Sequence, residues 1–393
     1  MTDIAHRARS VAALFAGVGI SATGFIAMVT VVPLVAEDLL GGPRWSGLPS
    51  AFAIIGNAVG TSWLATVMAQ SGRRRGLVLG YTIAGVAALA AAVAAGYSIF
   101  PLLLVSIFVL GVGYGASRLS RYAAADLYEP ERRARAIGWV VWAGTIGSVL
   151  GPILLEPARQ MSVLLTLPDT MGPFLLASLT MGFAGLILRI GFPRDVGARA
   201  PTSIGRGRAM ANLRSAKSQI ALAALVIGQV VMVLIMTMTA VHLRSEGGNL
   251  RSIGFVIAAH AFGMYALSPF SGYLSDRLGR RAIILLAGAL LVSAGLVSGS
   301  AGSDVSRLAL GLFLLGWGWN LGFVSGSALL TEAVPDADRT RLQGFADSIV
   351  WASAASAGLA SGLLLHAVGF TRLCHLGALL ALLPAAVIAL RRS

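Results

Sequence analysis

Twelve apolar segments alternate with short polar stretches along this 393-residue chain. A helix needs about 20 apolar residues to cross the hydrocarbon core of a bilayer, and each segment is close to that length. The pattern therefore predicts an all-α membrane protein with twelve transmembrane helices, at roughly 11–36, 47–69, 76–96, 99–119, 134–155, 172–190, 218–242, 250–274, 281–301, 305–330, 342–366 and 370–390.

The first segment follows Arg7 and Arg9, as the apolar part of a signal peptide would. It is longer than such a part, and it ends at Pro33 and Glu37-Asp38 instead of a small-residue cleavage site. We therefore expect it to be retained as a helix.

The longest polar stretch, 191–217, divides the helices into two sets of six. We predict an N-terminal six-helix bundle at 1–190, a cytoplasmic linker at 191–217 and a C-terminal six-helix bundle at 218–393. A linker at the midpoint indicates two repeats. Glycines within the helices, as in the run 111–115, indicate close helix packing.

Basic residues are distributed unevenly over the predicted loops. If the N-terminus is cytoplasmic, 24 of the 30 Lys and Arg residues lie on the cytoplasmic side and 6 on the outer side. This positive-inside asymmetry predicts that both termini are cytoplasmic, in the cytoplasmic (inner) membrane of a bacterium. It also excludes nucleic-acid binding as the origin of the +14 net charge, because the charge is spread over alternate short loops.

Composition narrows the function further. Hydrophobic residues make up 56% of the chain and charged residues only 12%, about half the charge of a soluble protein. The single cysteine, Cys374, excludes an intrachain disulfide, and the single lysine, Lys217, does not belong to a GxxxxGK phosphate loop. The chain also has no GxSxG or HExxH motif. We therefore expect neither an enzyme nor an ATP-driven pump, and no cofactor.

The loop after the eighth segment reads Gly-Tyr-Leu-Ser-Asp-Arg-Leu-Gly-Arg-Arg over residues 272–281. It resembles the G-x-L-x-D-R-x-G-R-R/K signature of the major facilitator superfamily. The resemblance implies a fold of two six-helix bundles and transport by alternating access, with the substrate at the interface of the halves. Asp276 is suited to the N-terminus of a neighbouring helix, and Arg277, Arg280 and Arg281 to charge pairing that closes the cytoplasmic side.

The corresponding loop of the first half is degenerate, because Ala69 stands where the aspartate belongs before Gly72-Arg73-Arg74-Arg75. The fifth segment carries Gly147-x-x-x-Gly151-Pro152, which is similar to the kernel of a motif found in antiporters of the superfamily. This kernel weakly favours export.

Acidic residues are nearly absent from the predicted spans. Asp347, in the eleventh segment, is the one acid inside a span. A cation/proton antiporter needs a buried acid that binds proton and substrate in turn, and the first half offers none. Asp347 is either a coupling or gating residue or a cap at the membrane interface.

Sulfur and imidazole side chains recur at helical spacing in two consecutive segments. Met232 and Met236 share one face of the seventh helix, and His260 and Met264 share one face of the eighth. At a rise of 1.5 Å per residue, Met232 and His260 each lie about 15 Å from the outer ends of their helices. Thioether and imidazole ligands suit Cu(I), so these four residues are a candidate metal site.

The two motifs resemble those of the CcoA-type copper importers, which supply copper for assembly of the cbb3-type cytochrome oxidase. This resemblance implies copper uptake through the same four residues. Gln229, on the Met232/Met236 face, and Trp319 and Asn320, within the tenth segment, are further substrate-binding candidates; interhelical hydrogen bonding is the alternative role for each.

The sequence thus predicts a monomeric secondary transporter for a small solute or metal ion, with copper uptake favoured. Efflux of a small amphipathic organic compound, with or without proton coupling, is the alternative. A transporter-like receptor or assembly protein is a third.

Overall fold

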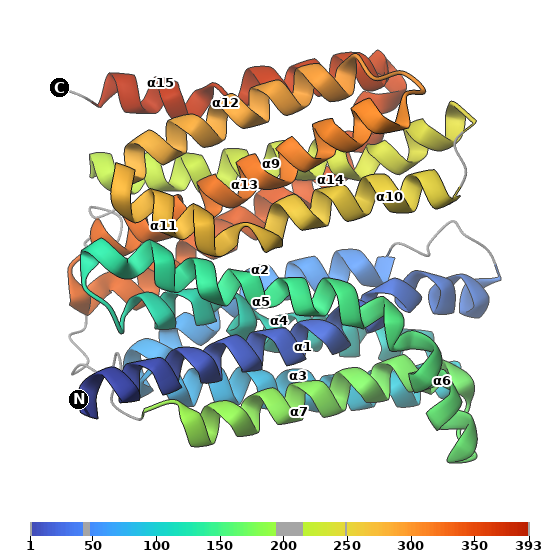
Figure 1. Cartoon of the computed structure of the whole chain (residues 1–393). Coiled ribbons are helices and arrows are strands. Elements are labelled where there is room, and N and C mark those ends of the chain that lie inside the picture. Colours follow the sequence, from blue (N-terminus) through green and yellow to red (C-terminus); the bar gives the residue numbers. More distant parts are fainter. Residues whose placement is uncertain (1, 42–47, 194–214, 248–249, 392–393) are drawn as a thin grey trace. The chain divides into compact units, whose positions relative to one another are not determined.

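The computed structural model describes residues 2–41, 48–193, 215–247 and 250–391. Within these ranges all regular secondary structure is helical (Figure 1). The first six predicted spans correspond to α1 (Thr2–Leu40), α2 (Leu48–Ser71), α3 (Arg73–Gly96), α4 (Phe100–Ala125), α5 (Arg133–Ile153) and α7 (Gly172–Gly191). The remaining spans correspond to α9 (Ala216–Ser245), α10 with α11 (Leu250–Ala261 and Ser268–Leu278), α12 (Arg280–Gly299), α13 (Val305–Glu332) and α14 with α15 (Asp336–Leu380 and Leu383–Leu390).

The number of membrane spans agrees with the sequence prediction when the bent pair α10/α11 is counted as one span and the long stretch interrupted at Gly369 as two. Among the described residues, ten helices are long and apolar enough to cross a membrane, and the bent pair α10/α11 makes an eleventh. One of the ten runs over 53 residues, Asp338–Leu390, which would be about 80 Å long if straight. Gly369 interrupts it with a φ of 79°, a backbone conformation that glycine adopts readily. This stretch therefore supplies two spans, and the predicted twelve-helix fold is confirmed.

The fifth helix ends slightly earlier than the predicted span 134–155. Helix α5 stops at Ile153, and a short helix, α6 (Leu155–Leu164), follows it outside the apolar span. On α6, Glu156 and Arg159 form an exposed ion pair of 2.7 Å. The hydrogen bonds that Arg159 donates lower the pKa of Glu156 to about 2, so this carboxylate stays ionised at neutral pH.

The predicted span 250–274 is not a straight helix. A π-helical turn, η4 (Phe262–Ala266), separates α10 from α11, and the two parts are bent by 45°. Pro269, in the first turn of α11, has no N–H to donate, and its ring conflicts with the carbonyl group four residues earlier. The proline therefore accounts for the bend.

The helices form two compact units. Unit 1 comprises Met1–Leu127, Ala143–Ser203 and Thr340–Trp351, and unit 2 comprises Tyr128–Trp142, Ile204–Arg339 and Ala352–Ser393. The units differ from the predicted bundles at two stretches: the start of α5 belongs to unit 2, and the start of α14 belongs to unit 1. Most of the predicted linker, residues 194–214, lies outside the described residues.

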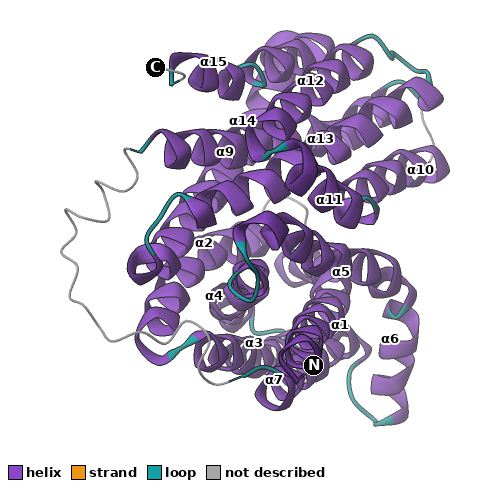
Figure 2. Cartoon of the chain, turned by 60° about the vertical axis from the view of Figure 1, so that its left-hand side comes forward, coloured by secondary structure: helices purple, strands orange, loops and turns teal. Residues whose placement is uncertain are grey.

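Unit 1 is held together by closely packed helices, with α4 against α2 and α3, and α7 against α1 and α3 (Figure 2). Glycines permit the contact of α2 with α4. A Cβ atom at Gly56 would lie 2.2 Å from the carbonyl oxygen of Phe108, and one at Gly111 would lie 2.3 Å from that of Ala53. The glycine density therefore reflects close backbone approach, as the sequence predicts.

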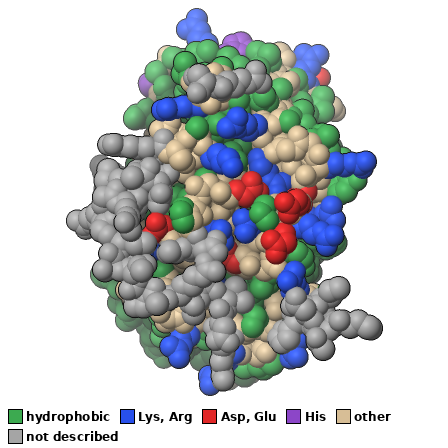
Figure 3. All heavy atoms as spheres, turned by 90° about the vertical axis from the view of Figure 1, so that its left-hand side faces the viewer, with side chains coloured by type: hydrophobic (Ala, Val, Ile, Leu, Met, Phe, Trp, Pro, Cys, Tyr) green, Lys and Arg blue, Asp and Glu red, His purple; other side chains and the backbone are tan. Residues whose placement is uncertain are grey.

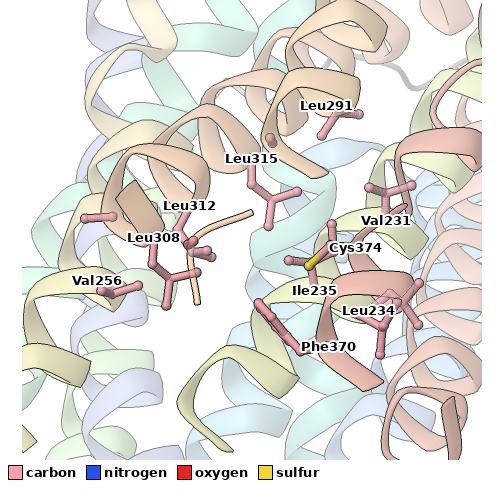
Figure 4. Close-up of a cluster of buried hydrophobic side chains, with 14 of the residues drawn as sticks. Val231, Leu234, Ile235, Val256, Leu291, Leu308, Leu312, Leu315, Phe370 and Cys374 are labelled. Atoms are coloured by element: carbon pink, nitrogen blue, oxygen red, sulfur yellow. The ribbon is translucent and has the colours of Figure 1, made fainter. Parts of the chain in front are cut away.

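Unit 2 has an aliphatic core to which α9, α10, α12, α13 and α14 contribute (Figure 4). Leu312 and Leu315 of α13 are fully buried in it. Cys374 is also fully buried there, so the single thiol is a packing residue.

Candidate functional site

Asp276, at the end of α11, lies where the sequence predicts it, at the N-terminus of a neighbouring helix. Its carboxylate accepts hydrogen bonds from the backbone N–H groups of Ala134 (3.2 Å) and Arg135 (2.9 Å), in the first turn of α5. These N–H groups have no partner within their own helix, and the helix dipole adds a favourable charge interaction. Asp276 therefore holds the start of α5 within unit 2.

Arg280 links this aspartate to two other elements. It forms ion pairs with Asp276 (2.6 Å) and with Glu332 at the end of α13 (3.0 Å). It also donates to the carbonyl oxygen of Pro130, just before α5. Gly272 allows α11 to lie close, since a Cβ atom there would be 2.5 Å from the carbonyl oxygen of Ala134.

The other two basic residues of the motif are exposed. Arg277 donates to the Tyr273 hydroxyl (2.6 Å), and Arg281 lies at the protein surface. Figure 3 looks onto the ends of the helices that carry this motif, where basic and acidic side chains are both visible at the surface. Of the three arginines, Arg280 is therefore the one that the structure places in the contact network.

The degenerate loop of unit 1 forms a related network. Arg73 follows Gly72 (φ 90°) as Arg280 follows Gly279 (φ 89°). The Arg73 guanidinium is fully buried, and it pairs with Asp126 at 2.9 Å, as Arg280 pairs with Glu332 of the next helix. It also donates to Gln343 at the start of α14. The arginine pairing is thus retained although the motif's aspartate is replaced by Ala69.

Asp347 forms a buried ion pair that the sequence did not identify. Its carboxylate accepts from Arg121 of α4 at 2.5 Å and from the Tyr122 hydroxyl at 3.2 Å. The side chains of Arg121 and Asp347 are only 3% and 1% exposed. Because Asp347 lies eleven residues into α14, its position is that of a buried charge and not of a helix cap.

His260 is directed toward α13. Its Nδ1 lies 3.0 Å from the carbonyl oxygen of Leu312, so Nδ1 carries the proton that this oxygen accepts. The ring is 1% exposed, and Nε2 has no hydrogen-bond partner among the described residues. His260 is thus a buried imidazole with one unused ring nitrogen.

The three candidate methionines have different surroundings. Met232 and Met264 are 8% and 9% exposed, while Met236 packs against the aliphatic core of unit 2. Helices α9 and α10 pack chiefly against α13 and have little contact with each other. What the structure shows of these residues is the packing of Met236 against the core of unit 2 and of α10 against α13.

Gln229 and Trp319 meet, as part of a cluster of aromatic side chains. The Trp319 indole donates to the Gln229 side-chain oxygen at 2.9 Å. Tyr265 of η4 packs edge-on against Trp319, with ring centroids 6.4 Å apart, and Phe323 stacks on it at 4.6 Å. One amide and three rings from α9, η4 and α13 thus lie together in unit 2.

Asn320 stabilises the broken helix beside this cluster. Its amide nitrogen donates to the carbonyl oxygen of Met264 (2.7 Å) and to the Ser268 hydroxyl (2.6 Å). A π-turn and a proline leave backbone groups without their usual helical partners, and Asn320 supplies a donor at that point. Asn320 thus makes interhelical hydrogen bonds, and its role in substrate binding stays a prediction.

Three arginines of unit 1 were not expected from the sequence to form buried contacts, because they were counted among the charges at helix ends and in loops: Arg73, Arg118 and Arg121. One signal was available. An acid within a span needs a partner, and Asp347 had none assigned, while Arg118 and Arg121 lie within α4.

Comparison with known proteins gives consistent results over the whole chain. A family model described as Major Facilitator Superfamily matches residues 14–248 and 220–393. The chain is similar to an uncharacterized MFS-type transporter of Bacillus subtilis, YdeG, with 34% identity over 385 residues, 95% of this chain and 88% of that protein. It is also similar to the riboflavin transporter RfnT of Brucella anthropi, with 31% identity over 379 residues, 94% and 92% of the two chains.

A solved structure has the same fold. The proton:xylose symporter XylE, bound to 6-bromo-6-deoxy-D-glucose, matches with a TM-score of 0.80 and 13% identity, covering 98% of this chain and 96% of that chain. At this level of identity the likeness concerns the fold alone.

Proposed function

This chain belongs to the major facilitator superfamily, and from that premise we propose that it is a secondary active transporter of a small organic solute with a planar aromatic part. It is a multi-pass membrane transporter and not an enzyme. We propose that both termini lie in the cytoplasm of a bacterial cell, because 24 of 30 basic residues fall on that side. We also propose that the protein lies in the cytoplasmic membrane and works as a monomer.

The observation that carries the substrate class is the Gln229–Trp319 cluster. Sites for small organic molecules combine apolar and aromatic walls with a few placed polar groups. Here Tyr265, Trp319 and Phe323 supply rings, and Gln229 supplies an amide held in place by the indole. The adjacent break in α10/α11 is of the kind that transporters of other folds use for substrate binding. Riboflavin, the solute in the name of the relative RfnT, is a planar heteroaromatic molecule and serves as the first test compound.

Copper uptake remains the competing prediction. It requires Met232, Met236, His260 and Met264 to share one ion. The unused Nε2 of His260 favours a ligand role, but Met236 in the aliphatic core and the direction of the His260 ring toward α13 favour packing roles.

Flux into proteoliposomes tests the two functions side by side. We expect wild-type protein to take up radiolabelled riboflavin, and Gln229→Leu or Trp319→Leu to slow uptake about tenfold, the cost of losing one buried hydrogen bond of about 1.4 kcal/mol. The matched control is Trp63→Leu, because Trp63 is 42% exposed on α2. Cu(I) entry, followed with an internal chelator dye, is expected to stay at the level of empty vesicles. Copper entry that is lost in His260→Ala and Met232→Ala would replace this proposal with the copper one.

We further propose that the Asp276 contact with α5 breaks and re-forms during transport. Asp276→Asn keeps the shape of the side chain and removes its charge. A charge at a helix N-terminus contributes about 1 kcal/mol, so we expect about a fivefold slower initial rate of riboflavin uptake. The exposed residue Arg281 provides the control, since Arg281→Gln should retain the wild-type rate. A wild-type rate in Asp276→Asn would exclude this gating role.

A further inference from the structure

Arg118 of α4 is held in an unusual environment within unit 1. Its guanidinium carbon lies 4.3 Å from the ring centroid of Trp351 and 5.5 Å from that of Tyr114. Its Nε is buried without a hydrogen-bond partner. Among the described residues no carboxylate forms an ion pair with it. Two aromatic faces therefore hold a cation whose hydrogen-bonding capacity is not fully used.

Arg121, one turn further along the same helix, has the opposite environment. It is 3% exposed and is paired with Asp347. Arg118 is instead partly exposed. The carboxylate of Asp347 on α14 accepts a hydrogen bond from Arg121 and forms no ion pair with Arg118, so Arg118 keeps donors for another group. A charge inside a membrane protein is costly without a partner and marks a functional site.

The surroundings of Arg118 also define the shape of a ligand. Phe25 stacks on Tyr114 with ring centroids 3.8 Å apart and nearly parallel planes. Phe25 and Trp351 are both partly exposed. Aromatic faces bind planar rings by stacking, and a guanidinium binds a carboxylate through two parallel hydrogen bonds.

We propose that Arg118, with Phe25, Tyr114 and Trp351, binds an anionic group of a planar solute, so that the planar solutes carried by this transporter include aromatic acids or related organic anions beside neutral compounds such as riboflavin. Transport of such a solute rests on the proposed function, whereas its binding does not. Binding at Arg118 is a property of unit 1 and can be measured without flux.

Equilibrium binding to purified protein tests the proposal with pairs of probes that differ in charge alone. The probes are benzoate, 4-hydroxybenzoate and 2-naphthoate, each beside its neutral amide. We expect wild-type protein to bind at least one carboxylate, and to bind it about tenfold or more tightly than its amide, because a hydrogen bond to a charged group contributes more than a neutral one. Equal affinity for acid and amide, or no binding of any of the three acids, overturns the proposal.

Variants of Arg118 locate the binding. Arg118→Gln should remove the preference for the acid, and Arg118→Lys should retain part of it, since lysine keeps the charge and loses the planar fork. Arg189→Gln is the matched control, because it removes the same charge from an exposed position of α7 in the same unit. An unchanged preference in Arg118→Gln overturns the proposal. If that variant is not folded, the acid-to-amide comparison on the wild type still decides.

Flux separates this inference from the proposed function. Carboxylate binding without solute flux into proteoliposomes would contradict the transport proposal and leave the Arg118 site intact. Uptake of riboflavin together with equal binding of acid and amide would support the transport proposal and contradict the Arg118 site.

Discussion

Replacing Asp347 with alanine is expected to remove most of the correctly folded protein from the membrane. The change leaves Arg121 buried, 3% exposed, without its carboxylate. Arginine cannot neutralise itself by losing a proton, and an uncompensated buried charge costs about 3–5 kcal/mol. The yield of monodisperse protein in gel filtration of a fluorescent fusion measures this effect.

Two further variants make the argument specific to charge. Arg121→Met should be milder than Asp347→Ala, because the remaining aspartate can take up a proton. The double variant Arg121→Met/Asp347→Leu should regain much of the lost yield, since apolar residues of similar volume often replace a buried ion pair without loss. Glu156→Ala is the control: it removes an acid from the exposed pair with Arg159 and should leave the yield unchanged. A double variant as poorly folded as Asp347→Ala would show that the pair is not the cause.

The double variant also separates stability from function. If the Arg121–Asp347 contact only supports folding, the restored protein should transport at the wild-type rate. We expect it to fold and to transport poorly, because an apolar pair cannot respond to a proton or exchange partners during a cycle.

The hydrophobic pattern was sufficient to predict the helices. Spans of about 20 apolar residues are a local property, so their number and approximate ends could be derived without tertiary information. The motif at 272–281 likewise led to the correct place for Asp276, because a carboxylate three residues before a glycine turn has a defined reach to a neighbouring helix N-terminus. Each of these features is encoded within a short stretch of chain.

The contacts that define the candidate sites are not local. Arg121 and Asp347 are separated by 226 residues, and only the packing of α14 against α4 brings them together. The partner of Gln229 could not be found for the same reason: Trp319 lies 90 residues away. The spacing of Met232 and Met236 fixed a shared face of one helix, but not which helix that face contacts. In the structure Met236 contributes to an aliphatic core.

The second large effect is expected at the contact of α2 with α4. A Cβ atom at Gly60 would lie 2.1 Å from the carbonyl oxygen of Val112 and 2.5 Å from its Cα. Both are backbone atoms, so no side-chain rotation relieves the overlap. Gly60→Ala therefore has to separate the two helices, and we expect a loss of about 3 kcal/mol or more of folding stability. Thermal unfolding of the purified protein, together with its yield, measures the loss.

The matched control is Gly182→Ala in α7 of the same unit, where a Cβ atom would meet nothing within 4 Å. There alanine should be neutral or stabilise the helix by up to about 1 kcal/mol, because glycine in a helix is the more flexible residue in the unfolded chain. The two variants add the same single methyl group to two helical glycines, so a difference between them isolates the close approach of α2 and α4. Equal unfolding temperatures for both variants would mean that the two helices are not packed through Gly60.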